Sequence, residues 1–124
     1  MSGINLAKLT EYIRTLKITF PHPTKSNVTI DQSLRVKFKY FDDEEYKDLN
    51  SRVKNEDTGL LEDKYTQRER CAKFVTWVNP EDIEGLENTD EVLEASISNI
   101  AIQNAMLIDF AECTSGFARK NLKK

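Results

Sequence analysis

The chain lacks the residues on which several classes of function depend. Its 124 residues include only four glycines, two cysteines and one histidine. There is no Gly-rich loop that could cradle a phosphate group and no G-x-S-x-G sequence of the hydrolase type. Paired acidic residues are frequent, but in hydrophilic connectors they are typical of solvated helix caps rather than acid–base pairs. We therefore expect a protein that is not an enzyme and needs no cofactor.

The cysteines and the histidine form neither a disulfide framework nor a metal site. Cys71 and Cys113 make no C-x-x-C pair, which is typical of small core residues in a reducing compartment. His22 stands alone between two prolines, so a zinc site would have to gather both cysteines and carboxylates from distant positions. We expect no metal ligands and place His22 in a loop.

Long hydrophobic segments are also missing. No apolar run approaches the roughly 20 residues that a membrane-spanning helix needs. Asn5, Lys8 and Glu11 interrupt the apolar residues of the N-terminus, which therefore does not look like a signal peptide. These features predict a soluble, intracellular protein without a membrane partner.

Charge is distributed unevenly, although the net charge is only −3. Residues 1–40 hold seven Lys or Arg and two Asp or Glu, residues 41–94 hold seven and seventeen, and residues 95–124 hold four and two. A basic region of one copy could contact the acidic region of the next, or the charges could pair within one copy or simply be solvated. The acidic total disfavours nucleic-acid binding, because phosphate contacts need a basic surface.

The N-terminal residues 4–16 have the spacing of a short amphipathic helix. Apolar residues recur there every three or four positions, at Leu6, Leu9, Ile13 and Leu16. This helix would end before the breaker Pro21-His22-Pro23. The alternative is that Lys17-Ile18-Thr19-Phe20 forms the first strand.

Residues 28–41 predict a β-hairpin. Residues 24–27 are expected as a turn, Val28-Thr29-Ile30 as a short strand and Asp31-Gln32-Ser33 as another turn. From residue 34 onward the chain alternates, which places Arg35, Lys37 and Lys39 on one face and the following residues on the other: Leu34, Val36, Phe38 and Tyr40. The hairpin should therefore have a basic outer face and an apolar inner face.

A helix is predicted to begin at Asp42-Asp43-Glu44-Glu45. An acidic first turn complements the helix dipole, and Glu45 has the spacing of a capping box. Tyr46, Leu49 and Val53 form its expected inner stripe. Residues 54–59 are predicted to be a polar connector.

The rest of the chain predicts further helices. One is expected over residues 61–74, stopped by Asn79-Pro80, although the β-rich composition of residues 74–78 leaves a short strand possible there. After an acidic loop, with Asn88 or Thr89 as cap, a helical series runs from Asp90 to about residue 115. It has a break at residues 96–98, and Gly116 ends it.

These elements together predict an α+β fold that is mainly helical, with a small N-terminal hairpin or sheet followed by three to four helices. We expect one domain over residues 1–124. Residues 1–41 form its helix and hairpin part, residues 42–115 its helical part, and residues 116–124 a basic, flexible tail.

Large aromatic and aliphatic side chains are the candidates for partner binding. The only tryptophan, Trp77, stands beside amphipathic helical segments, and burial of such side chains supplies much of the free energy of association. The predicted apolar strip consists of Tyr65, Phe74, Trp77, Ile100 and Ile108. For each of these residues the alternative is a place in the core.

The order of these features resembles the tail assembly chaperones of long-tailed, siphovirus-like bacteriophages and related prophages. A basic alternating strand (residues 34–40) runs into an acidic-capped helix (residues 43–49), followed by Val75-Thr76-Trp77, an acidic loop, a terminal apolar helix and a Lys-Asn ending. The likeness covers about residues 16–121. The chain departs from the family pattern in its helix-like N-terminus and in Val78-Asn79-Pro80, where the family often carries glycine.

The resemblance implies a protein of the bacterial host cytoplasm that binds the phage tape measure protein, keeps it soluble and is absent from the mature virion. It also implies self-association, and recruitment of the tail tube protein through a longer product made by ribosomal frameshifting. The C-terminal residues permit such slippage, because their codons can form slippery heptamers: Lys120, Asn121, Leu122, Lys123 and Lys124. The alternatives are a structural virion component, such as a head–tail connector or tail-end protein, and a small nucleic-acid-binding regulator.

Overall fold

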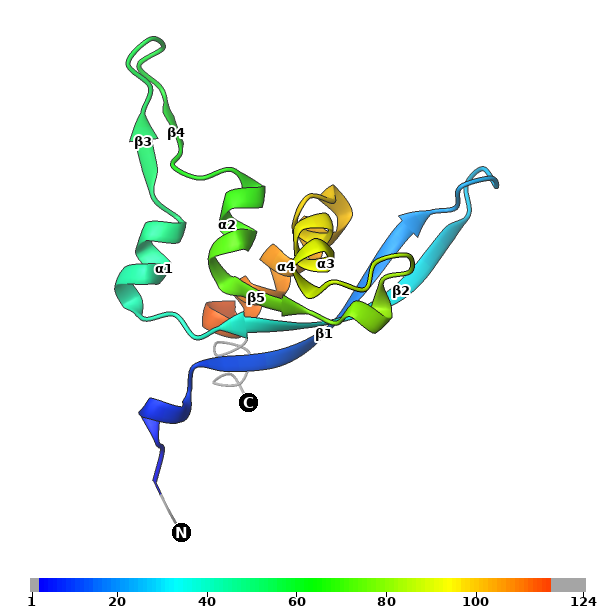
Figure 1. Ribbon diagram of the computed structural model, residues 1–124. Helices are drawn as coiled ribbons and strands as arrows, with labels where there is room; N and C mark the ends of the chain where they lie inside the picture. Colours follow the sequence, from blue (N-terminus) through cyan, green and yellow to red (C-terminus); the bar gives the residue numbers. More distant parts are fainter. Residues whose placement is uncertain (1–2, 117–124) are drawn as a thin grey trace.

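The computed structural model describes residues 3–116 and has a mixed α+β fold (Figure 1). The main sheet is antiparallel, with the strand order β1–β2–β5, and a separate two-stranded hairpin consists of β3 and β4. The strands are β1 (Glu11–Pro21), β2 (Thr29–Lys39), β3 (Arg52–Lys54), β4 (Leu61–Asp63) and β5 (Val75–Val78). The predicted α+β class is confirmed, whereas the expected predominance of helix fits only loosely.

The helices lie on one side of the main sheet (Figure 1). Those of the described residues are α1 (Asp43–Leu49), α2 (Gln67–Phe74), α3 (Thr89–Ile97) and α4 (Ile100–Ala111). Single turns occur at η1 (Leu6–Lys8) and η2 (Pro80–Asp82), and α4 continues into one π-helical turn, η3 (Glu112–Gly116). The candidate frameshift-encoding residues 120–124 lie outside the described residues.

Strands β1 and β2 pair over their full length and define an inner and an outer face of the sheet. Glu11 lies opposite Lys39 at one end, and Pro21 lies opposite Thr29 at the other. The inner face, which contacts the helices, carries buried residues from both strands: Leu16, Ile18, Leu34, Val36 and Phe38. The predicted apolar face of β2 is thus confirmed for residues 34–38, whereas Tyr40 lies beyond the strand and is 41% exposed.

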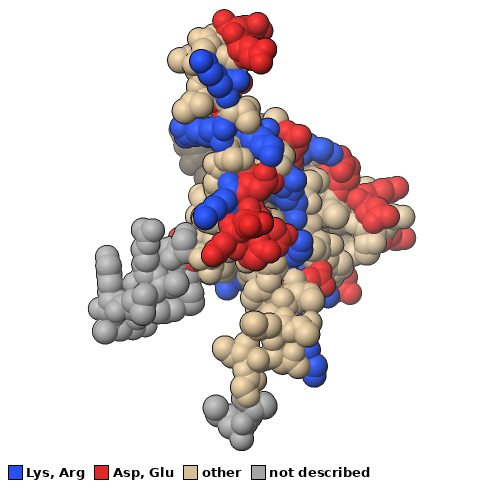
Figure 2. Space-filling model, turned by 90° about the vertical axis from the view of Figure 1, so that its left-hand side faces the viewer, with Lys and Arg blue, Asp and Glu red and all other residues tan. Residues whose placement is uncertain are grey.

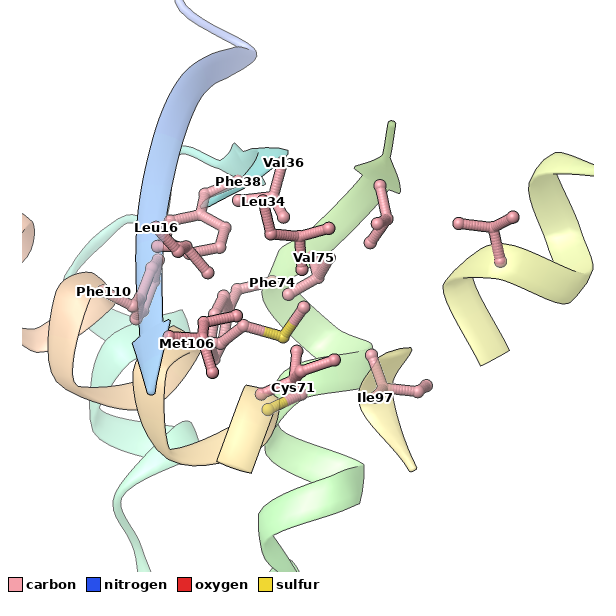
Figure 3. Packing of buried hydrophobic residues seen from close by; sticks show 14 of the residues in the cluster. Leu16, Leu34, Val36, Phe38, Cys71, Phe74, Val75, Ile97, Met106 and Phe110 are labelled. Atoms are coloured by element: carbon pink, nitrogen blue, oxygen red, sulfur yellow. The ribbon is translucent and has the colours of Figure 1, made fainter. Parts of the chain in front are cut away.

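Three phenylalanines from different elements form the centre of the core (Figure 3). Phe74 of α2 and Phe110 of α4 stack with their ring centroids 4.0 Å apart and their planes 11° apart. The ring of Phe38 of β2 is nearly perpendicular to both, with centroid distances of 5.0 and 5.7 Å. Because edge-to-face and offset-stacked pairs are the favoured aromatic geometries, this triad fixes how α2 and α4 sit on the sheet.

The expected helix over residues 4–16 is wrong. Only Leu6–Lys8 form a 3-10 turn, and the strand alternative is correct, because β1 begins at Glu11. Residues 12–20 are rich in β-branched and aromatic side chains, and pairing with β2 satisfies their backbone groups. Ile13, one of the apolar residues on which that prediction rested, lies on the outer face of the sheet and is 63% exposed.

The expected turn at residues 31–33 is also wrong, because β2 runs through it. Asp31 lies opposite Thr19, whose hydroxyl donates to the Asp31 carboxylate at 2.8 Å. The chain turns at residues 22–28, which include the predicted turn 24–27; Asn27 has a φ of 62°, and the His22 Nδ1 accepts from the amides of Thr24 and Lys25. His22 is therefore a loop residue, as predicted.

Residues 50–66 differ most from the prediction. The expected connector 54–59 and the first part of the expected helix 61–74 form the β3–β4 hairpin, and Val53 belongs to β3, where it is 48% exposed. Helix α2 begins only after Thr66, whose side chain caps it in a capping box with Glu69. The predicted short strand near residues 74–78 exists as β5.

Three other predicted features of the helices are confirmed. Asp42 caps α1 and forms a capping box with Glu45, and Asn88 caps α3. The predicted break in the terminal helical series separates α3 from α4. Gln103, buried at the start of α4, donates to the Ile97 carbonyl at 2.6 Å and so ties the two helices together at this break.

Candidate protein-binding site

Phe74 does not belong to any surface of this fold. Its side chain is fully buried in the aromatic triad with Phe38 and Phe110. A partner could reach it only if the core opened. Its assignment to a partner-binding strip is therefore withdrawn, and the core alternative is correct for this residue.

Tyr65 is half-buried and acts within its own chain. Its hydroxyl donates to Asp48 Oδ2 at 2.6 Å, and two ammonium groups lie near its ring, that of Lys64 at 5.3 Å and that of Lys73 at 4.2 Å from the ring centroid. Cations over an aromatic face interact favourably with its quadrupole. These contacts place Tyr65 at the junction of α1, α2 and the β3–β4 hairpin.

Trp77 lies on the outer face of the main sheet. It is paired with Lys37 of β2, whose ammonium group is 5.4 Å from the centroid of the indole. A register shift between Lys37 and Phe38 interrupts the pairing of β2 with β5 at this point. Trp77 is partly exposed and faces away from the phenylalanine triad.

Ile100 and Ile108 are exposed aliphatic residues on α4. Their exposed fractions are 70% and 62%, and the helical rise places them about 12 Å apart. Ile108 borders a groove of about 220 Å³ between α4 and β1. The groove is also lined by Thr15, Leu16, Lys17, Ala105, Asp109 and Glu112.

An ion pair fixes α4 to β1 beside this groove. The guanidinium of Arg14 donates through Nε to Asp109 Oδ2 at 2.7 Å and through its second nitrogen to Oδ1 at 2.9 Å. The hydrogen bond to Asp109 raises the pKa of Arg14 above its already high ordinary value. This two-point contact holds α4 at a defined distance from β1, so that the groove between them exists in the free protein.

The structure thus separates the five predicted residues. Ile100 and Ile108 share the outer side of α4, Trp77 lies on the outer sheet face, Tyr65 supports the hairpin, and Phe74 is in the core. A single continuous strip does not form. Ile100 and Ile108 remain the candidates for partner binding, beside the groove that Ile108 borders.

The sequence reasoning missed another set of exposed apolar residues. Leu60 and Leu61 of the β3–β4 hairpin are 67% and 66% exposed, and Ile13 protrudes from the outer sheet face. The available signal was the six-residue turn 55–60, which contains Gly59 with a φ of 73° and joins two short segments that each carry an apolar residue. Such a loop predicts a hairpin rather than a helix start.

The described thiols do not resemble catalytic nucleophiles. Burial raises the pKa of Cys71 to about 11 and also raises that of Cys113, while a nucleophilic cysteine needs a lowered value. Among residues 3–116, no group of three His, Cys, Asp or Glu side chains could hold a metal ion. In the same residues, no helix combines the length and apolar character needed to cross a membrane.

The Asp48 carboxylate accepts hydrogen bonds from Lys64 and Tyr65 at the base of the β3–β4 hairpin. We predict that these bonds make the free energy of unfolding decrease at low pH. Hydrogen bonds from Lys64 and Tyr65 lower its pKa below the ordinary 3.8, and hydrogen bonding lowers those of Glu45 and Glu69 below 4.5. The unfolded chain therefore binds protons more readily, so this stabilisation is present at neutral pH and is lost as the pH falls below the ordinary values of 3.8–4.5 and through the lowered ones. Urea unfolding between pH 7 and pH 2.5 should show this decline.

The Asp48→Asn variant tests the assignment. It should be less stable than the wild type at pH 7, and its stability should decline less steeply toward low pH. Asp57→Asn, at the exposed tip of the hairpin, should keep the wild-type profile. Parallel curves for the wild type and Asp48→Asn would show that Asp48 does not contribute.

Comparisons of this chain with protein-family models, curated proteins and solved structures gave no match.

Proposed function

We propose that this protein is a tail assembly chaperone of a long-tailed bacteriophage, which binds the tape measure protein in the host cytoplasm, keeps it soluble and leaves before the virion is complete. The observation that carries the proposal is the pair of exposed isoleucines on α4, Ile100 and Ile108, of which Ile108 borders the groove between α4 and β1. The order of sequence features that resembles the chaperone family supports the same function. Binding by contact requires no cofactor, metal ion or catalytic residue.

The proposed contact is between α4 and an apolar helical stretch of the tape measure protein. Aliphatic side chains of the partner would cover Ile100 and Ile108, and the groove beside Ile108 would take one of them, in the manner of helix-in-groove recognition. Complete burial of an isoleucine side chain contributes about 1.5–3 kcal/mol. Two such residues give a weak, reversible contact at each site, which suits a chaperone that must later be displaced.

A longer frameshifted product would extend the same surface. In this proposal its additional segment recruits the tail tube protein, while the part shared with the short form holds the tape measure protein. Copies that also contact one another along one long partner would bind it more tightly than single copies, because the contact between copies makes each further binding event intramolecular.

The function is tested by co-expression with the tape measure protein encoded by the same phage or prophage. The double variant Ile100→Asp, Ile108→Asp should fold and should lower the soluble fraction of the partner at least severalfold, because two carboxylates replace the apolar contact. Val28→Asp, an exposed aliphatic position in the β1–β2 loop, is the matched control and should behave as the wild type. If the soluble fraction of the tape measure protein were the same with the wild type and both variants, α4 would not be part of the binding surface.

A structural virion component is the second candidate. It is favoured by the two hairpins that project from the body of the fold, β1–β2 at one end of the main sheet and β3–β4 beside α1 and α2 (Figure 1). Projecting hairpins suit subunits that interlock with neighbours in a permanent assembly. Mass analysis of purified virions separates the candidates, because a structural component remains in the particle and a chaperone does not.

A further inference from the structure

The β3–β4 hairpin forms an arm (residues 51–64) that projects away from the core (Figure 1). All six of its strand residues are exposed, and so is Leu60 at its turn. A two-stranded hairpin on its own is only marginally stable in water. An arm that holds two neighbouring leucines in solvent is therefore a candidate for burial against another surface.

The base of the arm is fixed by polar contacts on both sides. Lys64 donates its amide to the Ser51 carbonyl at 3.0 Å and its ammonium to Asp48 Oδ1 at 2.8 Å. The Ser51 hydroxyl donates to the Asp48 carbonyl at 2.6 Å. These bonds join both strands of the arm to the end of α1, so that the arm projects in a defined direction.

The tip of the arm is also organised from within. Asn55 Oδ1 accepts from the amides of Asp57 at 2.8 Å and Thr58 at 3.2 Å, and Asn55 Nδ2 donates to Glu62 at 3.0 Å. Residues 55–63 contain four acidic and no basic residues. Figure 2 shows carboxylate residues gathered at the end of the arm, at the top of the molecule. The tip therefore presents leucines beside negative charge in a preformed turn.

The outer face of the main sheet has the complementary composition. Ile13 of β1, Lys37 of β2 and Trp77 of β5 lie opposite one another in one row across the three strands. A shallow hollow of about 430 Å³ lies beside Ile13 and Lys37. No helix among residues 3–116 covers this face, because the helices pack against the other one (Figure 1).

The charges that lack partners have opposite signs on the two surfaces. On the outer sheet face Arg35 contacts Asp82 and Lys39 contacts Glu45, which leaves Lys17 and Lys37 without a carboxylate among the described residues. The remaining charged residues of this face are Glu11 and Asp31. On the arm, Glu56 and Asp57 contact no cation within residues 3–116. Complementary potentials of this kind select and orient a partner.

We propose that the arm of one copy binds the outer sheet face of a second copy. Leu60 and Leu61 cover Ile13 and Trp77, and Glu56 and Asp57 approach Lys17 and Lys37. The two surfaces are different, so the contact is heterologous and repeats head to tail, giving a ring or an open chain of copies. It does not use Ile100 or Ile108 and does not require the tape measure protein.

The test is a mixing experiment followed by light scattering during size-exclusion chromatography. The wild type should form species larger than a dimer whose mass rises with concentration. An arm variant, Leu60→Asp with Leu61→Asp, and a sheet variant, Ile13→Ser with Lys37→Glu, should each be folded monomers. Their equimolar mixture should stop at a heterodimer, because only one intact arm and one intact sheet face remain. Val28→Asp should assemble as the wild type does.

Charge exchange gives a second measurement that does not remove apolar surface. Glu56→Lys with Asp57→Lys should weaken assembly at least about tenfold, which corresponds to about 1.4 kcal/mol. Combination with Lys17→Glu and Lys37→Glu should restore it. A monomeric wild type at millimolar concentration, or a mixture of arm and sheet variants that stays monomeric, would overturn the proposal. Arm variants that assemble normally but fail to solubilise the tape measure protein would also overturn it and would assign the arm to that partner.

Discussion

Replacing Phe110 with alanine is expected to lower the free energy of unfolding by about 3–5 kcal/mol, the largest effect of any single change considered for this chain. Phe110 stacks on Phe74 and makes T-shaped contacts with Phe38 and Phe41 at centroid distances of 5.7 and 5.1 Å. Its removal leaves a cavity between α2, α4 and the sheet that rigid neighbouring rings cannot fill. Urea unfolding followed by circular dichroism measures the loss.

The control for this experiment lies on the same helix. Ile108→Ala removes an aliphatic side chain that is 62% exposed and should change the stability by no more than about 0.5 kcal/mol. A small effect of Phe110→Ala, similar to that of Ile108→Ala, would mean that the aromatic triad does not hold α4 to the sheet.

Removing Asp109 is expected to cost about 2 kcal/mol, because it breaks a two-point charged contact and leaves the Arg14 guanidinium without its partner. The exposed fractions of the two side chains are 38% and 17%, so solvent screens the contact only in part. Arg14→Lys should recover little of the loss of Arg14→Ala, since an ammonium cannot reproduce the planar pair of hydrogen bonds. Unfolding of Asp109→Ala, Arg14→Ala and Arg14→Lys measures these differences.

An exposed ion pair on the same sheet provides the comparison. Arg35 lies 3.9 Å from Glu81, whose side chain is 86% exposed. Glu81→Ala should therefore change the stability by less than about 0.5 kcal/mol. Equal effects of Asp109→Ala and Glu81→Ala would mean that the Arg14–Asp109 pair does not fix α4 to β1.

Features encoded by neighbouring residues could be predicted from the sequence. The capping box of Asp42 and Glu45, the cap at Asn88 and the break between α3 and α4 depend on residues only a few positions apart. The apolar face of β2 was visible because strict alternation extends over several residues. Each of these signals is local, and the tertiary structure does not override it.

The features that were predicted wrongly depend on pairing between distant residues. Leu6, Leu9, Ile13 and Leu16 fit a helical period, but pairing with β2 gives the segment from residue 11 onward a strand period instead. The arm was missed because Leu61 was assigned to a helix, although Thr66 and Glu69 mark the true start of α2. The spacing of apolar residues along one segment does not show whether that segment will form a helix or pair with a distant strand.

The candidate site was predictable only in part for a similar reason. Phe74, Trp77 and Ile108 are all large and apolar, so composition could not tell which of them is buried. The tertiary structure determines which residue is buried. Phe74 is buried in the triad, Trp77 lies on the outer sheet face and Ile108 is exposed to solvent. The arm and the outer face became candidates only when their exposure and unpaired charges could be compared.

The central claim, that this protein acts by covering apolar segments of the tape measure protein, is tested most directly by calorimetric titration of the purified protein with soluble fragments of that partner. The account predicts saturable binding with a negative heat-capacity change, because apolar surface is buried, and loss of that signal in the Ile100→Asp, Ile108→Asp variant. The absence of any binding heat at several temperatures, or the same binding heat with the wild type and with the Ile100→Asp, Ile108→Asp variant, would contradict it.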